Sequence, residues 1–315
     1  MLTPKRPEMT AHGGAALIAR TPARRVYKGE RSLRMSVVVG IVVLNVLLLV
    51  IPIGIAFVGS FHQWNPLNGT FNYLGLDNYT QLLGDARFWT ATANTGIFGV
   101  VVITLRVALG LALAYAVWSK MTRFKTFFRT LFYMPTVTPL VAVAYVWKLM
   151  YHPQVGAINS IFGFDVNWLF DSQFALPAIM LMTVWKDFGY AVILFLAGLY
   201  SLPEDALEAA GVDGASAWQR FRLIVLPLLR PMMLFVVVTS IISYLQAFVQ
   251  VMVLTKGGPG TSTSIISYLV YEEAFVKYNF GYASAIAFVL LILTALLTLV
   301  SFKMSGGRKL FGKGA

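Results

Sequence analysis

Three ionisable residues lie inside long apolar stretches of this sequence. Arg106 stands midway in one stretch, and Lys186 and Asp187 are neighbours midway in another. A charge in such a setting is costly unless it pairs with an opposite charge, reaches a backbone carbonyl or lines a water-filled path. Two interpretations therefore stay open: the three groups neutralise one another between helices, or some of them contact a solute that crosses the membrane.

Aromatic and amide side chains accompany these charges. They are Trp185, Tyr190, Tyr244, Gln246, Phe248 and Gln250. Hydroxyl, amide and aromatic groups are the partners that a sugar site requires. Gln246 and Gln250 are four residues apart, which predicts that they share one face of a helix. The alternative is that the two amides only hydrogen-bond neighbouring helices.

Several other kinds of site are excluded by the residue types. Cysteine is absent, and the three histidines are far apart, so neither a thiolate site nor a histidine metal cluster is expected. The string 307–313 has the Gly and Lys spacing of a Walker A loop, but Gly314 follows where Ser or Thr is required. We therefore expect no cofactor on this chain and no catalytic residues, and any ATP and Mg²⁺ would be bound by a partner.

The composition indicates a membrane protein. Of 315 residues, 58% are hydrophobic and 12% are charged, whereas about a quarter of an ordinary soluble domain is charged. Six apolar runs are long enough to cross a bilayer, which takes about 20 helical residues. The predicted spans are 35–59, 93–118, 131–150 (interrupted by Pro135 and Pro139), 174–200, 231–254 and 283–302. The predicted fold class is all-α, polytopic, with six transmembrane helices.

The basic residues predict the orientation. Nineteen of the 25 Lys and Arg residues lie in the tail 1–34, in the second-to-third and fourth-to-fifth connections, and at the C-terminal end 303–315, which includes the predicted tail 304–315. Because Lys and Arg favour the cytoplasmic side, both termini are predicted to be cytoplasmic, flanking a permease domain at 35–303. The net charge of +12 is then a matter of topology, and no nucleic-acid partner is expected. Predicted anchors at the membrane interfaces are Trp64, Trp89, Trp118, Trp147 and Trp168.

The fourth-to-fifth connection, 201–230, is predicted to be a helical hairpin. Ser201 and Glu204 have the spacing of a capping box, so a short helix is expected to begin at Pro203 and to stop at Gly211. Asp213 is expected to cap a second helix that continues to about Leu223. Such a hairpin, with small residues at its bend, is suited to a partner's groove, although it could equally be an amphipathic surface element.

Within this hairpin, Glu208-Ala-Ala, then Gly214, then Ile224-x-Leu226-Pro227 resembles the EAA signature of permeases in binding-protein-dependent ABC importers. The aromatics after 213–216 resemble those of its carbohydrate-uptake branch. The resemblance covers about 35–303 and is nearest to the maltose-type first permease without its large periplasmic insertion. It implies a type I importer fold with a coupling hairpin that binds an ATPase. The implied coupling residues are Glu204, Glu208, Ala209, Ala210, Gly211, Asp213, Gly214, Ala215, Trp218, Phe221, Leu226 and Pro227.

The resemblance also implies the partners and the setting. These are a second homologous permease, a cytoplasmic ATPase dimer, an external solute-binding protein and lipid, in a bacterial inner membrane. The substrate is expected to be a sugar or oligosaccharide; a neutral one is favoured, and an acidic saccharide or glycerol phosphate is the alternative because the spans hold one excess positive charge. The rival class is an ion-coupled carrier or channel. No inverted repeat is visible in the sequence, and only Asp187 could act as the buried carboxylate of such a carrier.

Overall fold

The computed structural model describes residues 28–119 and 122–304, so most of the two predicted tails and the string 307–313 lie outside the described residues. The chain divides into two compact units, residues 1–53 and 54–315. The first contains α1 (Lys28–Asn45), a π-helical turn (Val46–Val50) and the start of α2 (Ile51–Gly59). The continuous helical stretch Leu33–Gly59 is long and apolar enough to cross a bilayer, which confirms the first predicted span.

A β-hairpin follows α2 and was not predicted. Strands β1 (His62–Asn65) and β2 (Thr70–Tyr73) pair antiparallel, with His62 opposite Tyr73. The buried side chain of Asn78, on α3 (Asp77–Gly84), donates hydrogen bonds to the carbonyls of Ser60 and His62. These two bonds fix the hairpin against the start of the next helix.

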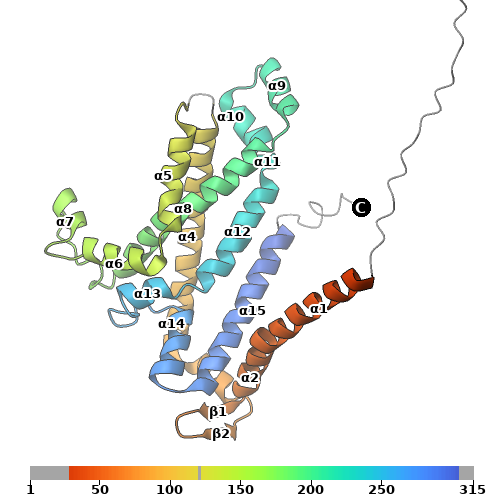
Figure 1. The fold of residues 1–315 in the computed structure, drawn as a ribbon. Coiled ribbons are helices and arrows are strands. Elements are labelled where there is room, and N and C mark those ends of the chain that lie inside the picture. Colours follow the sequence, from red (N-terminus) through yellow and green to blue (C-terminus); the bar gives the residue numbers. More distant parts are fainter. Residues whose placement is uncertain (1–27, 120–121, 305–315) are drawn as a thin grey trace, which may run out of the picture. The chain divides into compact units, whose positions relative to one another are not determined.

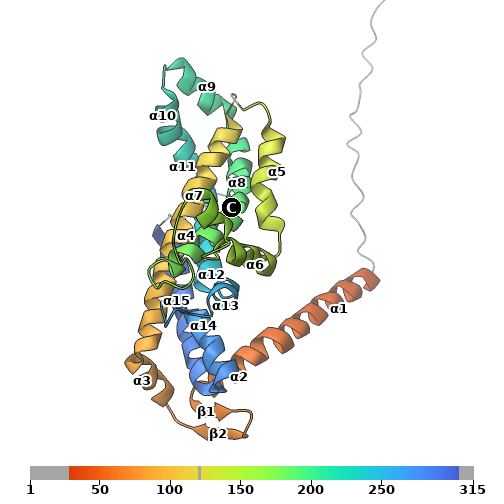
Figure 2. The same cartoon turned by 90° about the vertical axis from the view of Figure 1, so that its left-hand side faces the viewer.

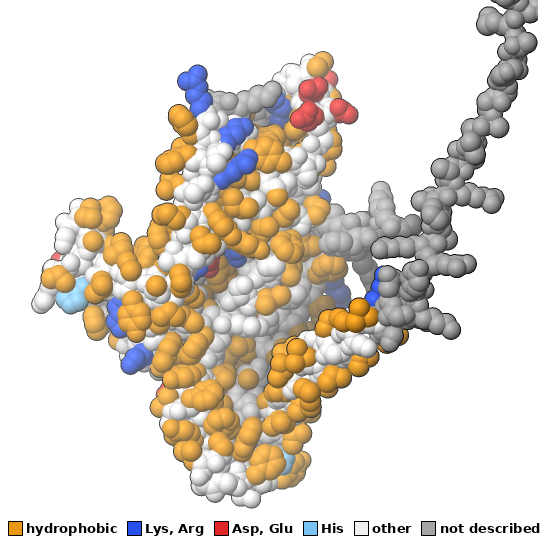
Figure 3. Space-filling model, viewed as in Figure 1, with side chains coloured by type: hydrophobic (Ala, Val, Ile, Leu, Met, Phe, Trp, Pro, Cys, Tyr) orange, Lys and Arg blue, Asp and Glu red, His pale blue; other side chains and the backbone are white. Residues whose placement is uncertain are grey.

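Long helices form the centre of the second unit (Figures 1 and 2): α4 (Ala86–Trp118), α8 (Ala175–Tyr200), α12 (Arg230–Leu245) and α15 (Phe280–Met304). Helices α4 and α8 touch closely, because a Cβ added at Gly110 would lie 2.6 Å from the Cβ of Ala191. Small residues permit this approach of two helices in a membrane. Hydrophobic side chains cover most of the visible face of this unit, and acidic ones gather near α9 (Glu204–Val212; Figure 3).

The third predicted span is broken into two helices. Helices α5 (Lys125–Val137) and α6 (Leu140–Met150) are bent by 94°. Thr138, at the break, has an extended backbone (φ −71°, ψ 136°), as expected for the residue before a proline. Pro139 rather than Pro135 therefore causes the bend, and Pro135 lies inside α5.

The fifth predicted span, 231–254, is also broken. Helix α12 ends at Leu245, and α13 (Val249–Leu254) begins after three non-helical residues. No Gly or Pro occurs at 246–248, so the local sequence did not predict this break. A tertiary contact helps to satisfy the freed backbone, since the Ser267 hydroxyl donates to the Leu245 carbonyl at 3.4 Å.

Outside the segment 201–230, the second unit also contains three short helical elements: α7 (Ala157–Phe162), α14 (Ile266–Tyr271) and the π-helical turn η3 (Glu272–Val276). Within the described residues, four helices are long and apolar enough to span a membrane, and up to six if each of two bent pairs counts as one span. The fold is therefore helical and polytopic, as predicted.

One predicted interface anchor is part of the core instead. Trp147 is only 7% exposed, and its ring centroid lies 5.3 Å from Tyr151 and 5.5 Å from Trp185. Trp89 is 52% exposed, as an anchor in the lipid interface should be. Spacing along an apolar helix did not distinguish these two environments.

Candidate functional site

The charged groups predicted inside the spans meet in the second unit. Lys186 Nζ lies 3.5 Å from Asp187 Oδ1 and donates to the carbonyl of Thr136 at 3.2 Å. Asp187 Oδ2 accepts a hydrogen bond from the Tyr244 hydroxyl at 3.0 Å. Because Thr136 is on α5 and Tyr244 on α12, the pair on α8 joins three helices.

Arg106 reaches the same place from α4. It is 5% exposed, its Nη1 donates to Ser240 Oγ at 2.8 Å, and its guanidinium carbon lies 5.4 and 5.5 Å from the ring centres of Tyr190 and Tyr244. Within the described chain no carboxylate pairs with Arg106, and its buried Nε has no hydrogen-bond partner. A hydroxyl and two aromatic faces therefore hold this cation. Tyr244 connects it to Asp187.

The two glutamines do not share a helix face, so that prediction was wrong. Gln246 is the exposed residue after α12, whereas Gln250 is on α13 and is 6% exposed. Phe248 lies in the break between them, with its ring centroid 5.2 Å from that of Tyr271. Within the described residues, no hydrogen bond or ion pair joins these three side chains to Arg106, Lys186 or Asp187.

Trp185 and Tyr190 remain accessible beside the network. They are 42% and 37% exposed, and both are on α8. Arg106, Lys186, Asp187, Tyr190 and Tyr244 thus form one polar cluster, which we call the central network. Its accessible edge carries aromatic surface of the kind that stacks on a sugar ring.

The predicted capping box at the start of the hairpin is wrong. Ser201 Oγ donates to the carbonyl of Gly198 at 2.8 Å, at the end of α8. The N-cap of α9 (Glu204–Val212) is Pro203, and no side chain caps it. Ser201 is thus used by the preceding helix, since Ser hydroxyls also bond to backbone carbonyls three or four residues earlier.

The bend of the hairpin lies later than predicted. Helix α9 continues through Gly211 to Val212, and Gly214 has the left-handed backbone, with φ +74°. Asp213 follows α9 and does not cap the second helix. That role belongs to Ser216, which forms a complete capping box with Gln219.

The second half of the hairpin continues past the predicted end near Leu223. It comprises α10 (Ala217–Arg220), a π-helical turn (Phe221–Val225) and α11 (Leu226–Leu228). Pro227 is in the first turn of α11, where its missing N–H costs little. The bend of 65° to α12 comes after it, at Leu229, which is 1% exposed.

The hairpin has a buried side and an accessible side. Ala210 is 7% exposed, and Phe221 packs with a core cluster from α4 and α8. Val212, Trp218 and Leu223 are 88%, 66% and 67% exposed. Large exposed apolar side chains at one end of a unit are typical of a protein interface.

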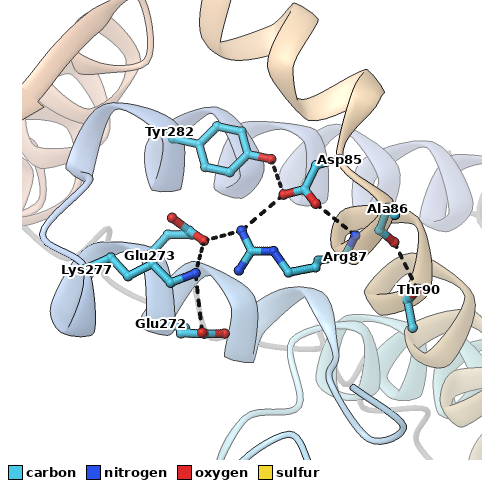
Figure 4. Close-up of polar contacts among 8 residues, drawn as sticks. All are labelled: Asp85, Ala86, Arg87, Thr90, Glu272, Glu273, Lys277 and Tyr282. Atoms are coloured by element: carbon cyan, nitrogen blue, oxygen red, sulfur yellow. Dashed lines mark hydrogen bonds and ion pairs between the residues drawn. The ribbon is translucent and has the colours of Figure 1, made fainter. Parts of the chain in front are cut away.

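A second polar cluster, shown in Figure 4, was not predicted as a site. Glu273, 3% exposed, accepts hydrogen bonds from Arg87 at 2.7 Å and Lys277 at 2.8 Å. Asp85 accepts from Arg87 at 3.2 Å and from the Tyr282 hydroxyl at 2.9 Å. These bonds connect the start of α4 with η3 and α15. Only the spacing of Glu273 and Lys277, four residues apart, was a signal in the sequence.

The charge of Asp85 is stabilised in this cluster. Burial acts to raise the pKa of Asp85, but hydrogen bonds from the Arg87 backbone and from Tyr282, together with the positive charge of Arg87, lower that pKa below its usual value. Asp85 also accepts from the Arg87 N–H as the N-cap of α4. The carboxylate therefore serves both the helix end and the cluster.

Comparison with known proteins gives consistent matches. Residues 106–304 match the family model described as binding-protein-dependent transport system inner membrane component. The chain is 37% identical over 246 residues to a probable ABC transporter permease of Pyrococcus horikoshii (76% of this chain, 84% of that one). It is 34% identical over 249 residues to a multiple sugar-binding transport system permease of Streptococcus mutans (78% and 86%).

A further relative covers nearly the whole chain. The diacetylchitobiose uptake system permease of Streptomyces coelicolor is 32% identical over 324 residues (96% of this chain, 90% of that one). Among solved structures, a bacterial ABC transporter that imports the acidic polysaccharide alginate matches with a TM-score of 0.78 at 21% identity (88% and 96%). This last similarity concerns the fold alone.

Proposed function

Because this chain belongs to the family of inner membrane components of binding-protein-dependent transport systems, we propose that it forms the translocation path of an ATP-driven importer of sugars or oligosaccharides. It is a multi-pass membrane permease and a non-catalytic subunit. The names of its relatives in S. mutans and S. coelicolor support a sugar substrate. Family membership argues against the alternative of an ion-coupled carrier or channel.

The observation that carries this proposal is the hairpin 201–230. Its apolar side is accessible, while its ends continue directly into α8 and α12. Those helices contribute Asp187 and Tyr244 to the central network. A movement of the hairpin imposed by a bound ATPase would therefore be transmitted to the polar cluster as a rigid-body motion.

The proposed orientation has the hairpin in the cytoplasm with both termini. Helix α4 has 33 residues and so is about 50 Å long, enough to connect the two faces of a membrane. Figures 1 and 2 show α9 at one end of the second unit and the β-hairpin at the other. The solute-binding protein would dock at the β-hairpin end, and a second permease would complete the path.

For the substrate we favour a neutral saccharide. Arg106 already has a hydroxyl and two aromatic partners, and Lys186 already has Asp187. An anion is therefore not needed to make burial of these cations tolerable. The excess positive charge and the free Nε of Arg106 keep an acidic saccharide as second candidate. Arg106→Gln should reduce uptake of neutral and acidic saccharides alike; a selective loss of acidic uptake would reverse our preference.

The coupling role is tested by a bulky residue at the bend. Gly214→Trp should leave membrane insertion intact but abolish copurification of the ATPase and sugar uptake, because its exposed position faces the proposed partner. Gly163→Trp is the matched control, since Gly163 also has a left-handed backbone (φ +68°) and open space around it, but lies outside the hairpin. Normal uptake by Gly214→Trp would refute the assignment.

A further inference from the structure

A cavity of about 660 Å³ lies between the hairpin and the helices that carry it. Its walls come from the end of α4, the start of α5, the end of α8, and the inner sides of α9 and the second half of the hairpin. Its volume falls within the range of about 300–1,000 Å³ that is usual for small-molecule sites. The cavity shares no residue with the central network, and the exposed apolar side chains Val212, Trp218 and Leu223 are not among its walls. Three of its lining residues belong to the coupling set that the resemblance implies: Glu204, Glu208 and Gly211.

Four charged side chains line this cavity. They are Lys125 and Arg220, which are basic, and Glu204 and Glu208, which are acidic. Within the described residues no ion pair joins either base to either carboxylate. Lys125 Nζ instead donates a hydrogen bond to the Trp118 carbonyl at 3.1 Å. The buried Nε of Arg220 has no hydrogen-bond partner in the described chain. Both signs of charge are therefore available to one bound molecule.

The balance of charge decides the class of ligand. A purely anionic molecule would pair with the two bases but leave the two carboxylates unpaired beside its own negative charge, and a purely cationic one would leave the two bases unpaired. A zwitterion can satisfy both. Tyr115 and Trp118 also line the cavity, and aromatic faces attract ammonium groups. The remaining lining is largely leucine and valine, which would suit the apolar part of a lipid.

We propose that this cavity binds the headgroup of a zwitterionic phospholipid from the cytoplasmic leaflet. The phosphate would contact Lys125 and Arg220, and the ammonium would lie between the α9 carboxylates and the aromatic rings. Trp118 ends an apolar helix, a position typical of the lipid headgroup region. The choice of leaflet rests on the proposed function, because it takes the hairpin end as cytoplasmic.

The bound headgroup would brace the hairpin against the spans. It contacts α9 on one side and the end of α4 and the start of α5 on the other, so it adds ionic bridges between elements that no ion pair of the described residues joins. Charge-assisted hydrogen bonds of this kind are stronger than neutral ones. Lipid composition would in this way affect how firmly ATPase movement is transmitted.

The test is retention of phosphatidylethanolamine by the complete importer, measured by native mass spectrometry. The complex is taken from nanodiscs of phosphatidylethanolamine with phosphatidylglycerol. Parallel nanodiscs contain glucosyl diacylglycerol, which is neutral but not zwitterionic, at the same mole fraction. Wild type should retain phosphatidylethanolamine and not the glucosyl lipid. Arg220→Gln and Lys125→Gln should each reduce retention about tenfold, the expected effect of losing one charged hydrogen bond.

Arg222→Gln is the matched control, because Arg222 is exposed, is two residues away and does not line the cavity. Its retention should equal that of wild type. The proposal would be overturned if the Arg220 and Lys125 variants retained as much phosphatidylethanolamine as wild type does. It would also be overturned if wild type retained the glucosyl lipid as well as it retains phosphatidylethanolamine. If soluble glycerophosphoethanolamine bound as tightly as the lipid, the inference that the zwitterionic headgroup belongs to a membrane lipid would be overturned. These measurements need no transport, so a failure of sugar uptake would bear on the proposed function alone.

Discussion

Replacing Gly110 by alanine tests the close contact between helices α4 and α8 in the second unit. The added Cβ would lie 2.6 Å from the Cβ of Ala191, 3.3 Å from its backbone carbon and 3.4 Å from Phe195. Carbon atoms pack at about 3.5–4.0 Å, so α4 and α8 must separate locally by about 1 Å. Because the nearest atoms belong to a Cβ and a backbone, no side chain can rotate away, and overpacking of this kind costs about 1–3 kcal/mol.

Gly99→Ala is the matched control on the same helix. Gly99 is also buried, but its added Cβ would meet only Leu245, at an ordinary 3.8 Å. Both variants gain about 0.5–1 kcal/mol from replacing glycine in a helix, so this gain cancels in the comparison. The free energy of unfolding of Gly110→Ala should therefore be about 1–3 kcal/mol lower than that of Gly99→Ala.

The purified permease in detergent is the sample for this measurement, with its unfolding followed by denaturant titration. A second readout is sugar uptake by the assembled importer. Arg106 is one helical turn from Gly110, and Tyr190 is next to Ala191, so a separation of α4 from α8 also moves Arg106 away from the Tyr190 ring. Equal stability of the two variants would refute the inferred contact.

Three further outcomes are expected. Glu273→Gln should lower the free energy of unfolding by about 1–2 kcal/mol, less than for a fully buried pair because its two basic partners are partly exposed; an unchanged thermal midpoint would contradict this. Because the folded-state pKa of Asp85 is lowered, its stabilising effect is present above its ordinary pKa and is lost as the pH falls through the folded value, so Asp85→Asn should destabilise the permease more at about pH 7 than at about pH 3. Equal destabilisation by Asp85→Asn at both pH values would argue against a lowered pKa of Asp85 in the folded state. Tyr244→Phe should cost about 1 kcal/mol by removing the hydrogen bond to Asp187 and should reduce uptake, whereas wild-type values in both assays would show that this bond is dispensable.

The sequence by itself determined the helical membrane class, the approximate positions of the spans and the place of the hairpin. These follow from properties that act over many residues: apolar runs of span length, the uneven distribution of Lys and Arg, and a signature of small residues at fixed spacing. The nearness of Lys186 and Asp187 could also be read directly, because they are neighbours in the chain.

The sequence could not place the local details that depend on competing partners. Ser216 rather than Ser201 forms the capping box, and Gly214 rather than Gly211 has the left-handed backbone at the bend. In each case two positions had a suitable residue type. The hydroxyl of Ser201 was used by a carbonyl of the preceding helix.

Only the tertiary structure decided the sites built from distant segments. No Gly or Pro in the sequence predicts the break after Leu245, and the hydroxyl of Ser267 donates a hydrogen bond to the freed carbonyl of Leu245. Arg87 donates a hydrogen bond to Glu273, which is 186 residues away in the sequence, and Arg106 donates one to Ser240, which is 134 residues away. Such partners depend on which helix faces meet, and an apolar helix can pack against its neighbours through many different faces. The reason is physical: in a bilayer the hydrophobic effect places helices across the membrane but does little to choose between their faces, so close packing and buried polar contacts make that choice.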